Sequence, residues 1–244
     1  MESGSTRSTG QVLSSDGASP PATWGRCPAH RRAVPAHSEK WAIWRILSDR
    51  HSWWQNRRVR SGFKVDDNTN EVVRFRTERL EGERMRESDA GYLAQLHSDP
   101  EVMATIGGVR DSDESAAWLR WNLDHWNKHR FGQWMLRAAD AGPIGRGGLR
   151  WIDECVGEHL VEVGFVLERS AWGRGYATEA TRAFVDIAEG HYKFDQLAAI
   201  TLEGNDASTR VLEKNGFVFE RWVDHTTGPY KFLRLRLGDA RDAE

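Results

Sequence analysis

The segment from residue 159 to residue 190 predicts a strand, a glycine-rich loop and a helix, and this order constrains the fold more than any other part of the chain. The loop is Trp172-Gly173-Arg174-Gly175-Tyr176-Ala177-Thr178. Its glycines let the backbone turn N–H groups toward an anion, and the first turn of the helix adds a partial positive charge. Arg174 would supply a further cation. The segment therefore predicts a site for a diphosphate.

Two common phosphate-binding motifs do not fit this loop. A Rossmann motif needs a third glycine, and here Gly-x-Gly is followed by Tyr-Ala-Thr. A Walker loop needs Gly-Lys followed by Ser or Thr, which is not present in the loop. A lone Gly-x-Gly is as consistent with a structural turn as with a binding site, so the loop has to be judged together with its neighbours.

The elements on both sides of the loop predict an α+β fold, with a mixed sheet and helices on both faces. Ala116, Leu119, Leu123 and Trp126 form one apolar helical face. Short spacings and turn residues predict an antiparallel meander over residues 133–138, 144–152 and 159–167. After the loop we expect a helix over 176–189, a strand over 196–202, a helix over 207–214, and strands over 217–221 and 230–237.

Composition divides the chain into two parts. Residues 1–76 hold 13 Lys and Arg against 7 Asp and Glu, and the rest hold 21 against 29, so the parts carry +6 and −8. Residues 1–38 are rich in Ser, Gly, Pro, Thr and Ala, a composition that buries too little apolar surface to fold. We therefore expect a disordered basic extension over 1–71 and a folded domain over 72–244. Tryptophans beside basic residues could contact nucleic acid, but a solvated tail is the favoured interpretation.

Several classes of protein do not fit the composition. Two cysteines cannot build a disulfide framework or a four-cysteine zinc site, and the nine histidines lack metal-ligand spacing, so no metal is expected. No run approaches the roughly 20 apolar residues that span a membrane. A cytoplasmic protein without a membrane partner is the expectation.

Three motifs in order resemble the GNAT family of N-acetyltransferases. The first is Val161-Glu162-Val163-Gly164-Phe165-Val166-Leu167 with the loop, which is similar to the family's acetyl-CoA-binding segment. The second is residues 205–217, Asn-Asp-Ala-Ser-Thr-Arg-Val-Leu-Glu-Lys-Asn-Gly-Phe. Upstream, residues 77–80 and 97–103 resemble the opening of the RimJ/RimL subgroup, the ribosomal-protein-alanine acetyltransferases. The resemblance covers residues 77–237.

The resemblance implies the GNAT fold, a mixed, mostly antiparallel sheet whose two central parallel strands splay apart around the cofactor. Acetyl-CoA is the implied cosubstrate. Backbone groups near Phe165, Val166 and Leu167 would hold its pantetheine arm, and backbone amides of the loop would hold its pyrophosphate. Asn205 would cap the following helix and contact the cofactor or the substrate, although capping alone explains an Asn there. The implied cofactor-binding residues are Phe165, Val166, Leu167, Gly173, Arg174, Gly175, Tyr176, Ala177, Thr178 and Asn205.

Acetylation of an amine needs a base for the amine and a proton for the departing thiolate. Glu162 alternates with apolar residues along the expected strand. The resemblance to the RimJ/RimL type implies that the glutamate at this position is the base. The alternative is a solvent-facing strand residue without a catalytic role. Many GNAT enzymes use a tyrosine as the acid, but Leu212 stands at that position. Ser208 matches a serine of the RimJ/RimL type and is the candidate acid. A serine that hydrogen-bonds backbone groups in the first turn of the helix would explain this residue equally well.

The resulting hypothesis is an enzyme that moves an acetyl group from acetyl-CoA to a primary amine by direct attack. The acceptor stays open between a protein N-terminus and a small amine, and the negative domain favours cationic acceptors. The alternative is a non-catalytic module that binds acyl-CoA, RNA or a protein partner, and Leu212 is its best support. Nucleic acid is the less favoured partner, and the sequence leaves a homodimer open.

Overall fold

The computed structural model describes residues 64–65, 71–152, 156–225 and 227–238. These residues form one nine-stranded sheet with helices packed on it. The strands are β1 (Lys64–Val65), β2 (Arg74–Arg76), β3 (Leu80–Arg84), β4 (Gln133–Ala138), β5 (Gly142–Ile152), β6 (Leu160–Leu167), β7 (Gln196–Leu202), β8 (Val218–His225) and β9 (Gly228–Arg236). The helices are α2 (Ala90–Ser98), α3 (Pro100–Met103), α4 (Ser112–His129), α5 (Tyr176–Gly190) and α6 (Asp206–Lys214), with short 3-10 turns at Glu87–Asp89 and Arg169–Ala171.

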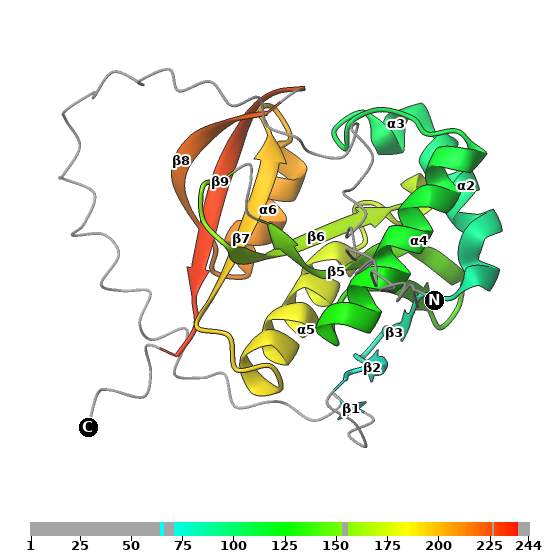
Figure 1. Cartoon of the computed structure of the whole chain (residues 1–244), viewed down its shortest axis with the longest axis horizontal. Helices are drawn as coiled ribbons and strands as arrows, with labels where there is room; N and C mark the ends of the chain where they lie inside the picture. Colours follow the sequence, from blue (N-terminus) through cyan, green and yellow to red (C-terminus); the bar gives the residue numbers. More distant parts are fainter. Residues whose placement is uncertain (1–63, 66–70, 153–155, 226, 239–244) are drawn as a thin grey trace, which may run out of the picture.

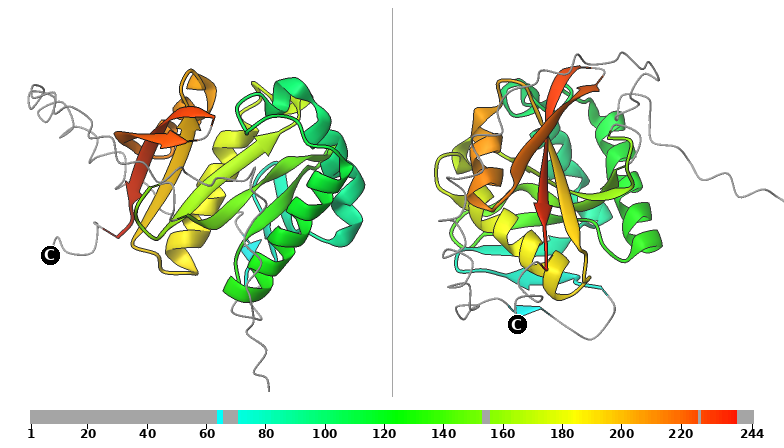
Figure 2. Two further views of the ribbon diagram at one scale, coloured as in Figure 1. Left: turned by 45° about the horizontal axis from the view of Figure 1, so that its top comes forward. Right: turned by 90° about the vertical axis from the view of Figure 1, so that its left-hand side faces the viewer.

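The sheet runs in the order β1-β2-β3-β4-β5-β6-β7-β9-β8, and every neighbouring pair except β6 and β7 is antiparallel. In Figure 1, α2, α3 and α4 gather at one end of the molecule, and β7, β8, β9 and α6 form the other. The left view of Figure 2 shows the same division. The predicted fold, a mixed and mostly antiparallel α+β sheet, is confirmed.

Two apolar layers cover the central strands. On one face α5 packs Ala180, Phe184 and Ile187 into the main core, where Phe184 stacks on Trp134 of β4. On the other face α2 and α4 pack Leu93, Trp118 and Leu119 against Met135. Because β4 to β6 are covered on both faces, they are rich in apolar residues and glycine rather than strictly alternating.

The two parallel strands β6 and β7 touch at one register pair, Glu162 with Ala198. Before and after this pair the described residues of the two strands do not pair with each other, although β6 pairs with β5 along its whole length. Figure 1 shows β6 and β7 pointing in different directions beyond this point. The splayed parallel strands expected from the sequence are therefore present, with Glu162 where they separate.

Most expected elements lie within two or three residues of their observed bounds, and β4 and β7 match exactly at both ends. Helix α4 begins at Ser112, directly after Asp111, whose side chain caps the helix in a reciprocal pair with Glu114. The segment from Asp224 to Pro229, expected to be a loop, instead lies in a tight β8–β9 hairpin, with His225 paired to Gly228. Lys64–Val65 pairs with β2, inside the predicted extension, of which residues 1–63 and 66–70 lie outside the described part.

Candidate active site

The glycine-rich loop leads directly into the start of α5. Gly173 and Gly175 have φ values of 71° and 82°, a left-handed conformation that glycine adopts without steric cost. Gly175 is the N-cap residue of α5, and no side chain caps this helix end. The first N–H groups of a helix have no partner within it, so the amides of Tyr176, Ala177 and Thr178 are available to an anion.

Arg79 and Arg174 place positive charge beside this helix end. Arg79 donates to the carbonyl oxygen of Arg174 at 2.9 Å and forms an ion pair with Glu179 at 2.6 Å. Arg174 forms an ion pair with Asp140 at 3.4 Å, and both guanidinium groups lie over the ring of Tyr176. Arg174 belongs to the loop itself. Arg79, which was not predicted from the sequence as a site residue, lies beside Arg174.

Glu162 is buried, with 4% of its surface exposed, so the solvent-facing alternative raised by the sequence is wrong. It faces the same side of the sheet as Arg150, its register partner on β5, whose Nε donates to Glu162 Oε2 at 2.5 Å. A buried carboxylate is costly unless it is paired. Arg150 supplies that pairing and fixes the position of the carboxylate.

Asn205 and Ser208 lie together at the start of α6, directly after β7. Asn205 Oδ1 accepts the Ser208 N–H at 3.1 Å, so Asn205 caps the helix as expected. Its Nδ2 donates to Thr105 Oγ1 at 2.9 Å, which ties α6 to the segment after α3. The Ser208 side chain is half-buried, and Leu212 is buried in the main core.

Phe165, Val166 and Leu167, which are predicted to hold the pantetheine arm, are the last three residues of β6, the strand that separates from β7. Val166 packs with Leu96, Val102 and Met103 under α2 and α3. Leu167 and Phe165 face α5 and the main core. Their side chains therefore serve packing, and the backbone edge of β6 toward β7 has no strand partner there among the described residues.

A buried charged cluster lies on the same face as Glu162. Arg146 of β5 is 4% exposed; its Nε donates to His97 Nε2 at 3.0 Å and its Nη1 to Gln133 Oε1 at 2.9 Å. Because an arginine only donates, His97 accepts at Nε2 and carries its proton on Nδ1, toward Ser115 Oγ at 3.1 Å. Burial and the charges of Arg146 and Arg110 lower the pKa of His97 to about 2. His97 is therefore neutral and adds no further positive charge beside Arg146.

Burial also lowers the pKa of Arg146 well below its usual value, and the neighbouring charges of Arg110 and Arg150 add to this effect. Arg110 hydrogen-bonds the carbonyl oxygen of Ile106 at 3.2 Å, and burial lowers its pKa to about 10. The face thus holds three neighbouring guanidinium groups. These arginines were not predicted as site residues from the sequence, although Arg146 and Arg150 at a spacing of four in a predicted strand share one face.

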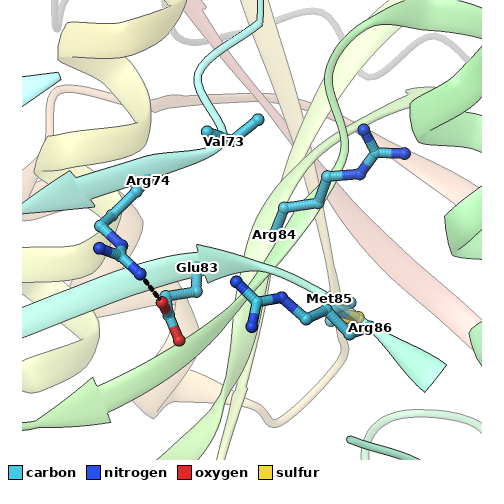
Figure 3. Close-up of a pocket in the computed structure, with 6 residues that line it drawn as sticks. All are labelled: Val73, Arg74, Glu83, Arg84, Met85 and Arg86. Atoms are coloured by element: carbon cyan, nitrogen blue, oxygen red, sulfur yellow. Dashed lines mark hydrogen bonds and ion pairs between the residues drawn. The ribbon is translucent and has the colours of Figure 1, made fainter. Parts of the chain in front are cut away.

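A hollow of about 350 Å³ lies elsewhere, on β2 and β3 (Figure 3). It is lined by Val73, Arg74, Glu83, Arg84, Met85 and Arg86, and Arg74 pairs with Glu83 across it. Two strands, β4 and β5, separate β3 from β6 in the sheet order, so this hollow is not part of the site around Glu162. Within the described helices, none is long and apolar enough to cross a membrane.

Comparison with known families shows to which family the chain belongs. Residues 79–218, more than half of the chain, match the model of the acetyltransferase (GNAT) domain. The chain belongs to this family of acyltransferases, which move an acyl group from an acyl-CoA to an amine. This membership favours the enzyme over the non-catalytic module.

Known relatives and structures agree with this assignment. The uncharacterized protein YkkB of Bacillus subtilis is 29% identical over 156 residues, which span 63% of this chain and 90% of YkkB. An acetyltransferase structure from Agrobacterium tumefaciens superimposes with a TM-score of 0.60 at 22% identity, covering 71% of this chain and 99% of that one. RimL, a ribosomal alpha-N-protein acetyltransferase in complex with coenzyme A, superimposes with a TM-score of 0.57 at 14% identity, covering 66% and 96%. These two structures support the fold.

Proposed function

We propose that this protein transfers an acetyl group from acetyl-CoA to a primary amine by direct attack, in a complex that holds both substrates. The observation that carries the proposal is the position of Glu162. It is a buried carboxylate at the one register pair between β6 and β7 in the described residues, where the two strands separate. A base at this point would meet an amine that approaches a thioester held between the strands.

The cofactor would lie in the splay, with its pyrophosphate at the start of α5. The open backbone edge of β6 at Phe165, Val166 and Leu167 would hold the pantetheine arm. The amides from Gly173 to Thr178 would take the pyrophosphate, aided by Arg174. Two features support this placement, namely the left-handed glycines at 173 and 175 and the absence of a side-chain cap on α5.

Each step of the transfer has a candidate group. Glu162, held by Arg150, would accept the proton of the incoming amine, directly or through a water. The amine nitrogen then forms a bond to the acetyl carbon, and the bond from that carbon to sulfur breaks. Ser208 at the start of α6 would give a proton to the departing thiolate, and Asn205 would hold the helix end in place. Leu212 cannot take the role of acid, because it is apolar and buried.

The RimJ/RimL type is part of this proposal. Its support is the pattern of motifs, the use of Ser208 instead of a tyrosine, and a fold shared with RimL. The acceptor is an amine, and the choice between a protein N-terminus and a small molecule is developed below.

The test is acetyl transfer by the full-length protein, followed as thiol release from acetyl-CoA with a panel of primary amines. Acetyl-CoA should also raise the Tm, because a ligand that binds only the folded state stabilises it. We expect at least one amine to be acetylated, with initial-rate lines that intersect when both substrates are varied. A rise in Tm with no transfer to any amine would overturn the catalytic proposal, and no rise at millimolar acetyl-CoA would overturn the cofactor site.

A further inference from the structure

The face of the sheet that carries Glu162 has a gap in its side-chain cover. Gln133 of β4, Gly148 of β5 and Gly164 of β6 form one row across three strands. Two of these three residues have no side chain. A methyl group added at Gly164 would meet nothing closer than Gln133 Nε2 at 3.9 Å. The space above Gly164 is therefore open toward the interior of the site.

The walls of this gap are the neighbouring rows. On one side Arg150 and Glu162 face each other, and on the other Arg146 lies opposite Val166. Trp118 of α4 covers Arg146, with the guanidinium 4.0 Å from the ring centre. Because strand residues on one face are about 7 Å apart along the strand, a small molecule above Gly164 would reach the carboxylate of Glu162.

On the side of the gap away from Glu162, the polar groups are donors. Gln133 is 4% exposed, and its Oε1 accepts from Arg146, which fixes its Nε2 as the end that points above Gly164. Among the residues that the structure describes, no hydrogen-bond partner is present for this Nε2. Arg146 likewise has no carboxylate within ion-pair distance among those residues, since its partners are His97, Gln133 and the ring of Trp118.

The charged residues around the gap also favour an anion there. Arg146 and Arg150 come from β5 and Arg110 from the segment before α4, while Glu162 pairs with Arg150 and Glu114 lies near Arg110. His97 is neutral. A buried cation without a counter-charge is unfavourable, and an anion in the gap would supply one.

We propose that the amine acceptor also carries an anionic group, a carboxylate, which binds above Gly164 between Gln133 Nε2 and the Arg146 side of the gap. The acceptor is thus a small amino acid, and its amine lies at Glu162. This inference rests on the proposed function and refines it, because it selects a small molecule over a protein N-terminus. It also reverses the expectation that the negative charge of the domain selects cationic acceptors.

The test compares binding of acids with binding of their neutral amides, by calorimetry on the full-length protein saturated with CoA. N-acetylglycine and N-acetyl-β-alanine are compared with their carboxamides, because these product analogues have no titrating amine. We expect each acid to bind at least tenfold more tightly than its amide. Equal binding, tighter binding of the amides, or no binding of either would overturn the inference.

Two variants locate the effect. Gln133→Met removes the donor with little change in volume and should reduce the preference for the acid at least fivefold. Gln196→Met is the matched control, because Gln196 also accepts a hydrogen bond from an arginine, Arg234, but lies outside the site. Both variants should keep the rise in Tm caused by acetyl-CoA. If Gln133→Met does not fold, the comparison of acids and amides on the unmodified protein decides.

The proposed function is scored separately, by transfer from acetyl-CoA to glycine, β-alanine, their amides and spermidine. Transfer to the amides or to spermidine in preference to the acids would keep the proposed function and overturn this inference. Tight binding of the acids without any transfer would overturn the proposed function, and with it the role of the acids as acceptors, and would leave only a carboxylate-binding site.

Discussion

Glu162 and Ala198 form the only register pair between β6 and β7 in the described residues 160–167 and 196–202. Beyond this pair, the edge of β6 that faces β7 has no strand partner. A parallel sheet normally continues its ladder along both strands, so this early separation creates the place for a wedge-shaped ligand.

The open edge of β6 leads to a prediction about its backbone amides. Acetyl-CoA should slow hydrogen exchange in residues 163–167, because the pantetheine arm would cover them. Peptides from β4, which is paired on both sides, serve as the internal control and should exchange at the same rate with and without the ligand. Protection confined to regions other than β6, the loop and α6 would contradict the placement of the cofactor.

Replacing Gly175 with valine should weaken binding of acetyl-CoA at least tenfold. The φ of 82° disfavours any residue with a Cβ, and a Cβ here would also lie 3.4 Å from Arg79 Nη2. Gly142→Val is the matched control, because Gly142 has a φ of 74° with nothing within 4 Å and is the first residue of β5, after the β4–β5 turn. The strain of about 1–2 kcal/mol is similar in both, so calorimetry should show a loss of affinity only for Gly175→Val. Equal affinity in the two variants would remove the loop from the site.

Ser208→Ala should lower kcat by about tenfold or more while leaving the KM for acetyl-CoA within about twofold, if Ser208 gives the proton to the thiolate. The cap of α6 depends on the backbone N–H of Ser208 and not on its side chain. The Tm should therefore change little. An unchanged kcat would leave Ser208 with a role in the first helical turn only.

Two buried histidines should make the stability depend on pH. Burial lowers the pKa of His97 to about 2 and that of His125 to about 4. Both lie below the value near 6.5 of an unfolded chain, so the unfolded state binds more protons as the pH falls through 6.5. The free energy of unfolding should then decrease by about 1.4 kcal/mol per pH unit for each histidine.

Urea unfolding between pH 6.5 and 5.0 measures this effect above the range in which carboxylates titrate. His125→Gln keeps groups that can bond to the Phe131 carbonyl oxygen and the Trp151 N–H, and it should roughly halve the slope. A flat curve for the unmodified protein would show that these histidines are not held neutral.

The order of elements could be predicted because most of it depends on local signals. Asp111 and Asn205 are N-cap residues, and Gly216, with a φ of 89°, follows α6 as expected. The splayed strands were predicted from the resemblance to the GNAT family. The β8–β9 hairpin was not recognised, because Asp224 to Pro229 contains polar and turn-forming residues that suit a loop and a hairpin equally well.

The charged cluster could not be predicted, because it depends on contacts between distant elements. Arg146, His97 and Gln133 come from β5, α2 and β4, and only the packed fold brings them within 3.0 Å. The burial of Glu162 and its pairing with Arg150 depend on the same register. A strand pattern shows which residues share a face, but it does not show which helix covers that face.

The most direct test of the proposed chemistry is the turnover of Glu162→Gln against Glu81→Gln over a range of pH. Glutamine can still accept the hydrogen bond from Arg150, so the fold and the affinity for acetyl-CoA should be retained. Glu81 of β3, which pairs with Arg74 and Arg76 of β2, is a carboxylate outside the site. We expect Glu162→Gln to lower kcat by about 10²-fold or more, most strongly at low pH, where the amine is protonated, and Glu81→Gln to match the unmodified protein. Equal turnover of all three proteins at every pH would contradict the assignment of Glu162 as the base.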